Sequence, residues 1–298
     1  MFKKILITTY IIATLTTGCA FAASSSSPSQ ASVASGAAIE NSAEKQARSA
    51  VIAQIMAASG MDEILEQLPA IAAMGFDQQP PPPVEREAFD KFRTAMLQPL
   101  DPAKTKPALV RFIEKRYDTQ RYAEVVALLN TPLSKKMTAL ELQASTPEAQ
   151  QEMMQFANSM LSQPSPQRLA LVKRLDKAQQ ATESMVEMQM MISSAMMKNM
   201  NRIVPEDKKM ADGEIAQMLT QMREQSLPQA RQFSQITMVY TYRSVSDSEL
   251  EEYTQLVESD TGLYLTSLLR DAFLNLFDNI STEIASHIGQ AFKTSNAL

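Results

Sequence analysis

The chain has 298 residues, with 28 Lys and Arg against 33 Asp and Glu, which gives a formal net charge of −5. This acidic balance argues against nucleic acid or an anionic lipid surface as the main partner, because both usually need a basic footprint. Seven Gly, no Trp and twenty Met are typical of an all-α protein, since helices need few residues with positive φ.

Residues 1–22 have the pattern of a secretory signal peptide. Lys3 and Lys4 precede a short apolar run, and an Ala-x-Ala cleavage site ends at Ala22. We therefore expect a periplasmic protein that is released after Ala22. The alternative is a lipoprotein that is cut before Cys19 and anchored there. No later stretch stays apolar long enough to cross a bilayer, so no transmembrane segment is expected.

Residues 23–43 are rich in Ser and Ala and are expected to form a flexible tether, because they hold too few large apolar side chains to offset the entropy of ordering. Apolar residues then recur at helical spacing, which predicts one or two amphipathic helices interrupted near Gly60. Four prolines at 80–83 predict a stiff extended connector, with a ligand for a proline-reading domain as the alternative. A new helix is expected over 84–96.

The rest of the chain is predicted to be helical and to divide at the Ser- and Pro-rich residues 162–167. This division defines a first helical unit at 44–162 and a second at 167–298. Helices of the first unit are expected at 109–129 with a turn near 117–119, at 133–142, and after an N-cap at Ser145 or Thr146.

The second unit is predicted to contain one long helix at 168–201 and shorter helices at 212–223 and 228–242, since proline usually ends or kinks a helix. Residues 236–242 have a strand-like composition. A single strand has no partner in an otherwise helical chain, so we expect a helix there as well.

Two stretches of the chain resemble each other and predict a tandem duplication of one helical unit. Residues 128–132 (LLNTP) align with 256–260 (LVESD) at an offset of 128. The tyrosines that precede them, Tyr117 and Tyr242, are 125 residues apart. The second copy would therefore carry three extra residues before its helix.

The stretch VSDSELEEYTQLVESDTG has the most legible local pattern in the chain. Ser246 is expected to be an N-cap, and Glu249 three residues later completes a capping box. Val245 and Leu250 can then close a hydrophobic staple over the helix start. The helix is expected to end near Ser259, and Gly262 to supply the backbone angles of a tight turn into the next helix.

This stretch resembles the bacterial domain of unknown function 2059 family, whose signature is a capped helix with Glu-Leu followed by a Ser-Pro-x-Gly turn. Glu249 and Leu250 match the first part, while Ser259 and Gly262 match the last, with Asp260 in place of the proline. The resemblance covers 236–288 well and 109–161 weakly. It implies an all-helical exported protein of Gram-negative bacteria, and it carries over no catalytic residue.

Few residues have the chemistry of a catalytic or metal site. His287 is the single histidine, and it is expected on the last amphipathic helix as an ordinary surface or half-buried side chain. Without Cys19 the chain has no thiol, which excludes a Cys-His pair and an ordinary zinc site. Acidic residues from Glu249 to Asp260 lack the oxygen-ligand loop of a Ca²⁺ site and fit the start of a helix better. We predict no metal and no cofactor.

Methionines are concentrated in MVEMQMMISSAMMKNM. Three interpretations remain open for them: adaptable core packing, a pliable groove for other polypeptides, and Cu(I) held by thioethers. The candidate binding residues are Met185, Met188, Met191, Met196, Met197 and Met200.

Together these observations predict two related helical bundle units behind a signal peptide and a tether. The expected function is that of an exported, non-catalytic interaction module that binds an envelope protein or peptide through a Met-rich apolar groove. The alternatives are Cu(I) handling by the same methionines and a cryptic hydrolase that uses His287. The sequence does not set the oligomeric state.

Overall fold

The computed structural model describes residues 42–77, 86–160, 164–203 and 208–295. Within these ranges it contains twelve α-helices, one short 3₁₀ helix and no strand, which confirms the all-α class. The predicted signal peptide, nearly all of the tether and the proline run lie outside the described residues. The elements are α2 (Ser42–Ala58), α3 (Met61–Asp77), α4 (Arg86–Leu97), η2 (Gln98–Leu100), α5 (Pro102–Glu114), α6 (Thr119–Leu129), α7 (Pro132–Ala144), α8 (Pro147–Met160), α9 (Pro166–Gln179), α10 (Ala181–Ile203), α11 (Asp212–Thr241), α12 (Asp247–Glu258) and α13 (Asp260–Ser295).

Two of the predicted helix boundaries have clear local causes. Gly60 separates α2 from α3 and has a φ of 73°, in the left-handed region that favours glycine. A Cβ there would also lie only 3.0 Å from Cδ2 of Leu142. Thr146, rather than Ser145, caps α8, because its Oγ1 accepts a hydrogen bond from the backbone N of Ala149 at 3.2 Å.

The prediction of one long helix over 168–201 was wrong, because the chain breaks between α9 and α10. Gln180 adopts a left-handed backbone with φ 43° and ends α9. Asp176 stabilises the break. Its Oδ1 accepts one hydrogen bond from the backbone N of Thr182 at 3.1 Å and another from Oγ1 of Thr182 at 2.9 Å. The side chain of one helix thus caps the start of the next.

The prediction of separate helices at 212–223 and 228–242 was also wrong, because α11 is continuous and contains Pro228. Proline lacks the N–H that would bond to the carbonyl of Glu224. Both residues are exposed, so water can satisfy that carbonyl and the helix continues. The strand-like residues 236–241 belong to α11, as the lone-strand argument predicted.

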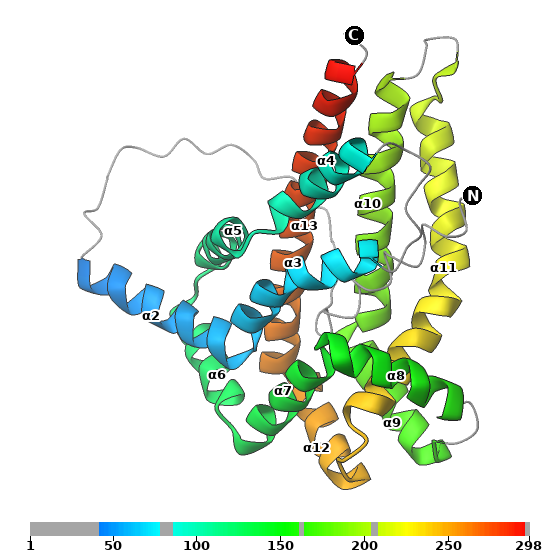
Figure 1. Cartoon of the computed structure of the whole chain (residues 1–298). Coiled ribbons are helices and arrows are strands. Elements are labelled where there is room, and N and C mark those ends of the chain that lie inside the picture. The colour runs from blue at the N-terminus through cyan, green and yellow to red at the C-terminus, as the bar shows by residue number, and fades with distance from the viewer. Residues whose placement is uncertain (1–41, 78–85, 161–163, 204–207, 296–298) are drawn as a thin grey trace.

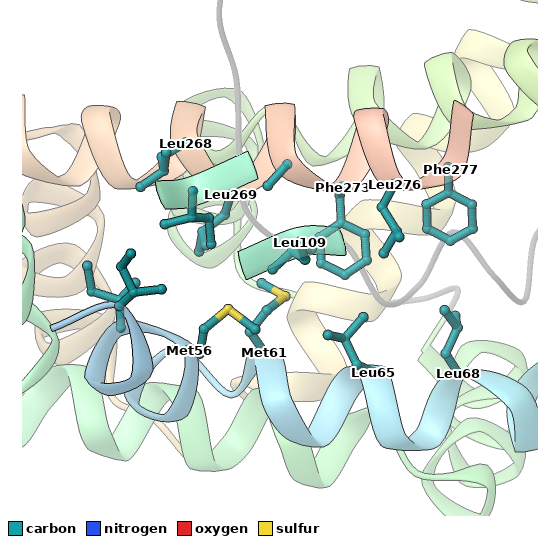
Figure 2. Close-up of a cluster of buried hydrophobic side chains, with 14 of the residues drawn as sticks. Met56, Met61, Leu65, Leu68, Leu109, Leu268, Leu269, Phe273, Leu276 and Phe277 are labelled. Atoms are coloured by element: carbon teal, nitrogen blue, oxygen red, sulfur yellow. The ribbon is translucent and has the colours of Figure 1, made fainter. Parts of the chain in front are cut away.

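The largest core lies between α13 and the N-terminal helices. Figure 2 shows Leu269, Phe273 and Leu276 of α13 facing Leu65 of α3, with Leu109 of α5 beside them. The rings of Phe273 and Phe277 stack at 6.0 Å between their centroids. The core therefore combines residues from both sides of the predicted boundary at 162–167.

A second core lies at one end of α10, α11 and α13, which stand side by side in Figure 1. It joins α7, α9 and α12 to the C-terminal end of α11 through fully buried residues such as Met137, Leu175 and Met238. Two smaller clusters connect α10 to α11 and α8 to α11. This end of the molecule holds most of the buried polar groups described below.

The turns from α6 to α7 and from α12 to α13 have the same hydrogen bonds at the predicted offset of 128. Thr131 Oγ1 accepts from the backbone N of Ser134 at 3.1 Å, and Ser259 Oγ accepts from the backbone N of Gly262 at 3.1 Å. Each hydroxyl also donates to a carbonyl three residues earlier. The match is consistent with a duplication, which stays a prediction.

No helix in the described part of the chain combines the length and the apolar character that a membrane span needs.

Candidate functional site

The start of α12 has the capping box that its sequence predicts. Ser246 Oγ accepts from the backbone N of Glu249 at 3.2 Å, and Glu249 Oε2 accepts from the backbone N of Ser246 at 3.2 Å. Val245 and Leu250 are both buried in the second core, as a hydrophobic staple requires. Lys136 and these Ser246 bonds lower the pKa of Glu249 to about 2.

The other end of α12 is a turn through a single residue, Ser259. Its Oγ donates to the carbonyl of Leu256 at 2.7 Å and accepts from the backbone N of Gly262. Gly262 lies inside α13 and does not have the positive φ that the sequence analysis expected. Glycine is required for another reason: a Cβ would lie 2.3 Å from the carbonyl oxygen of Leu256 and 2.5 Å from that of Val257.

Four of the five acidic residues of α12 are paired with basic side chains of α7 and α9. These pairs satisfy the carboxylates without a cation ligand, and no group of three or more His, Cys, Asp or Glu side chains within the described ranges is placed to hold a metal. The pairs are Arg168 with Asp247 at 2.9 Å, Lys136 with Glu249 at 2.5 Å, and Arg174 with Glu251 at 2.9 Å and with Glu258 at 2.8 Å.

Four elements meet at a buried polar group that we call the Glu141 cluster: Glu141, Gln179, Tyr242 and Tyr253. Tyr242 Oη donates to Glu141 Oε1 at 2.5 Å, and Tyr253 Oη donates to the same oxygen at 2.9 Å. The two rings lie 6.0 Å apart. Glu141 comes from α7, Gln179 from α9, Tyr253 from α12, and Tyr242 directly follows α11.

The surroundings of Glu141 oppose its ionisation. Glu141 as a residue is half-buried, but its carboxyl group is fully enclosed, and this burial raises its pKa to about 7 although the two tyrosine hydroxyls act in the opposite direction. Burial also raises the pKa of Tyr242 and of Tyr253 well above 10.0, with the nearby Glu141 adding to the effect. Glu141 can therefore gain or lose one proton near neutral pH.

Gln179 adds a further unfavourable feature to the cluster. It is 3% exposed, and its Oε1 accepts no hydrogen bond within the described residues. A buried acceptor without a partner costs about 1–3 kcal/mol. The cluster is thus a polar site held inside an apolar core at some cost in stability.

Asp176 forms a separate polar centre one turn before Gln179. Besides capping α10 through Thr182, Asp176 Oδ1 accepts a hydrogen bond from Ser234 Oγ of α11 at 2.6 Å. These bonds tie α9, α10 and α11 together inside the molecule. Asp176 and Ser234 are both buried, so they have a structural role.

The methionines of α10 do not gather on one surface. Met185 is 6% exposed and packs against Val186 and Ala230 in the cluster between α10 and α11. Met188 is 2% exposed and belongs to the largest core, against which Met191 also packs. Met185 and Met188 are three residues apart on α10, but they join different clusters.

Further along α10 the side chains become partly exposed. Residues 190–195 and Met197 are all half-buried, although α10 lies between α11 and α13. Met196 and Met200 lie on α10, and His287 lies on α13, but these three side chains are outside those that the structure describes.

Sequence reasoning missed the Glu141 cluster because its members are far apart in the chain. Glu141 and Tyr242 are separated by 101 residues, and Glu141 and Tyr253 by 112. The one local signal is a glutamate at a position of α7 that faces the core. The chain matches no protein-family model, no curated protein and no solved structure.

Proposed function

We propose that this protein is a non-catalytic helical module of the bacterial envelope that binds an apolar segment of another polypeptide through the second half of α10. The predicted signal peptide at residues 1–22 supports the location. The motif at 246–262 supports membership of the domain of unknown function 2059 family, which we also propose.

The observation that carries the proposal is the partial exposure of α10 from residue 190 to residue 195 and at Met197. Met191 and Ile192 pack against the largest core and are also partly exposed. Thioether side chains are flexible and polarizable, so they adapt to apolar partners of different shapes. Met185 and Met188 are buried and support this surface from inside.

A photo-reactive amino acid at position 197 tests the proposal in intact cells. We expect it to cross-link to one envelope protein, which mass spectrometry then identifies. The same probe at Met154, which is 67% exposed on α8, is the matched control and is not expected to capture that protein.

The identified protein is then titrated with purified variants. We expect the double variant Met191→Ser, Met197→Ser to bind it about tenfold more weakly, because two apolar contacts are lost, while Met154→Ser binds as the wild type does. Equal affinity of all three proteins, or equal cross-linking from positions 154 and 197, would show that the α10 methionines do not form a binding surface.

A further inference from the structure

The helices α7 and α8, residues 132–160, form a pair that covers one side of the C-terminal half of α11. Met137 of α7 is fully buried in the second core. Ala149 and Met153 of α8 are buried against Tyr240 of α11, and Phe156 contacts the Tyr240 ring at a centroid distance of 5.4 Å. In Figure 1 this pair lies at the same end as α9 and α12.

Polar contacts also attach this pair to its neighbours. Lys136 pairs with Glu249 at the surface at 2.5 Å. Glu152 Oε2 accepts a part-buried hydrogen bond from Tyr240 Oη at 2.8 Å, and Met153 Sδ accepts a buried one from Thr237 Oγ1 at 3.3 Å. Glu141 bonds to the tyrosines of its enclosed cluster. Ion pairs at the surface change little near neutral pH, because lysine and carboxyl side chains ordinarily change charge well away from pH 7. Glu141 is different, because an ionised carboxylate in an apolar core needs a compensating charge.

The side chains that face Glu141 provide no such charge within the described residues. They are Tyr242 after α11 and Tyr253 from α12, and the uncharged side chain of Gln179 from α9 bonds to both tyrosines. Charged groups of neighbouring elements whose partners the structure describes contact other groups instead, and Arg243, directly after Tyr242, donates to the carbonyl of Tyr240 at 2.8 Å. Arg174 and Arg168 of α9 pair with acids of α12, Lys136 pairs with Glu249, Glu152 bonds to Tyr240, and Glu124 of α6 pairs with Arg121.

We propose that α7 and α8 act as a pH-dependent clasp on α11, fastened while Glu141 is neutral and released when Glu141 loses its proton. In the fastened state the carboxyl group keeps both tyrosine hydroxyls inside the second core. Loss of the proton places an uncompensated negative charge there, and the charge reaches water when α7 moves away from α11 and α12. Release uncovers Tyr240, which is 3% exposed in the fastened state.

The clasp does not involve the α10 methionines, so it can fail or succeed independently of the proposed function. It needs only that the second core opens locally, which requires less free energy than global unfolding.

Thiol labelling tests the clasp with two adjacent positions of α8. Met153 is 6% exposed and faces α11, whereas Met154 is 67% exposed. Cysteine is introduced at one or the other position in the full chain carrying Cys19→Ser, and its alkylation rate is measured at about pH 6 and at about pH 8.5. The ratio of the rate at 153 to the rate at 154 removes most of the pH dependence of the thiol itself.

We expect this ratio to rise at least about fivefold from the lower to the higher pH, because the open population follows the ionisation of Glu141. With Glu141→Gln the ratio is expected to stay low at both pH values, since the amide cannot ionise and its oxygen still accepts from the tyrosines. A flat ratio in the wild type, or the same rise in Glu141→Gln, overturns the proposal.

Hydrogen exchange provides a second readout that does not depend on cysteine at a packed position. After correction for the intrinsic pH dependence, amides of 132–160 are expected to exchange faster at the higher pH in the wild type and not in Glu141→Gln. Amides of α13 next to Phe273 are the internal control and are expected to change in neither protein. Equal protection of 132–160 in the two proteins at both pH values contradicts the clasp.

Discussion

Asp176 and Glu141 are carboxyl groups in the same half of the molecule, but their hydrogen bonds differ. Both oxygens of Asp176 accept from Thr182, and one also accepts from Ser234. Glu141 receives both of its donors on a single oxygen. Asp176 is thus provided with donors from its own helix junction, whereas Glu141 depends on tyrosines from two other elements. The bonds of Asp176 to Thr182 form within one helix junction, with Ser234 of α11 adding to them, whereas the bonds of Glu141 form only in the assembled core.

Glu141 gives the protein a stability that depends on pH. Its pKa is about 7 in the folded protein against 4.5 in the unfolded chain, so the folded state binds the proton more tightly. The resulting stabilisation is fully present below pH 4.5, decreases as the pH rises and is lost above about pH 7. It amounts to about 3 kcal/mol at most.

This pH dependence is measured by urea unfolding of the wild type and of Glu141→Gln across that range. The difference in unfolding free energy between the two proteins is expected to change in favour of the variant as the pH rises, because only the wild type acquires the buried charge. A difference that stays constant from acid to neutral pH would contradict the raised pKa.

At the scale of the element, the junction between α12 and α13 depends on the absence of one side chain. Gly262→Ala places a Cβ against two backbone carbonyls that cannot rotate away. We expect a loss of about 2 kcal/mol or more in the free energy of unfolding, since a rigid overlap must be relieved by moving a helix.

Gly213→Ala is the matched control, because a Cβ at Gly213 in α11 meets nothing within 4 Å. This variant is expected to be unchanged or more stable by up to about 1 kcal/mol, as alanine favours helix. Both are measured by denaturant unfolding followed by circular dichroism. Equal stability of the two variants would mean that the helices at Ser259 adjust more freely than the structure indicates.

Helix starts and stops were predictable where their cause lies within a few residues. The capping box of Ser246 and Glu249, the turn at Gly60 and the N-cap at Thr146 each depend on residues that are close in the sequence. The break at Gln180 was not predictable, because a left-handed glutamine is unfavourable on its own and is held by Asp176 together with Ser234 of α11. The continuity of α11 through Pro228 likewise depends on exposure, which only the fold determines.

The candidate sites show the same limit. The methionines of α10 were evident from the sequence. Their division between two buried clusters was not, because it depends on how α11 and α13 pack against α10. The Glu141 cluster had no sequence signal beyond one glutamate, since its hydrogen-bond partners lie more than a hundred residues away. Contacts of this length are set by packing of the whole chain.

At the scale of the whole molecule, the two predicted units share their largest core. Phe273 and Leu276 of α13 pack with Leu65 and Leu109 of the N-terminal helices. We therefore expect that residues 44–162 and 167–298, each produced alone, expose this apolar surface and do not unfold cooperatively.

Circular dichroism with urea, together with the chemical-shift dispersion of proton NMR spectra, checks each half. Mixing the two halves is expected to restore a sharp transition, because the shared core can then form. Two halves that unfold cooperatively on their own, with free energies that add up to that of the intact chain, would show that they are independent domains.

The single residue between α12 and α13 has a mechanical consequence. Ser259 bonds to both helices, and the close backbone approach at Gly262 leaves no slack between them. The 36-residue α13 therefore starts directly from α12 and runs on through the largest core. We expect a rotation of α12 against α9 to be passed to the first turns of α13 instead of being absorbed between the two helices, because no flexible linker separates them.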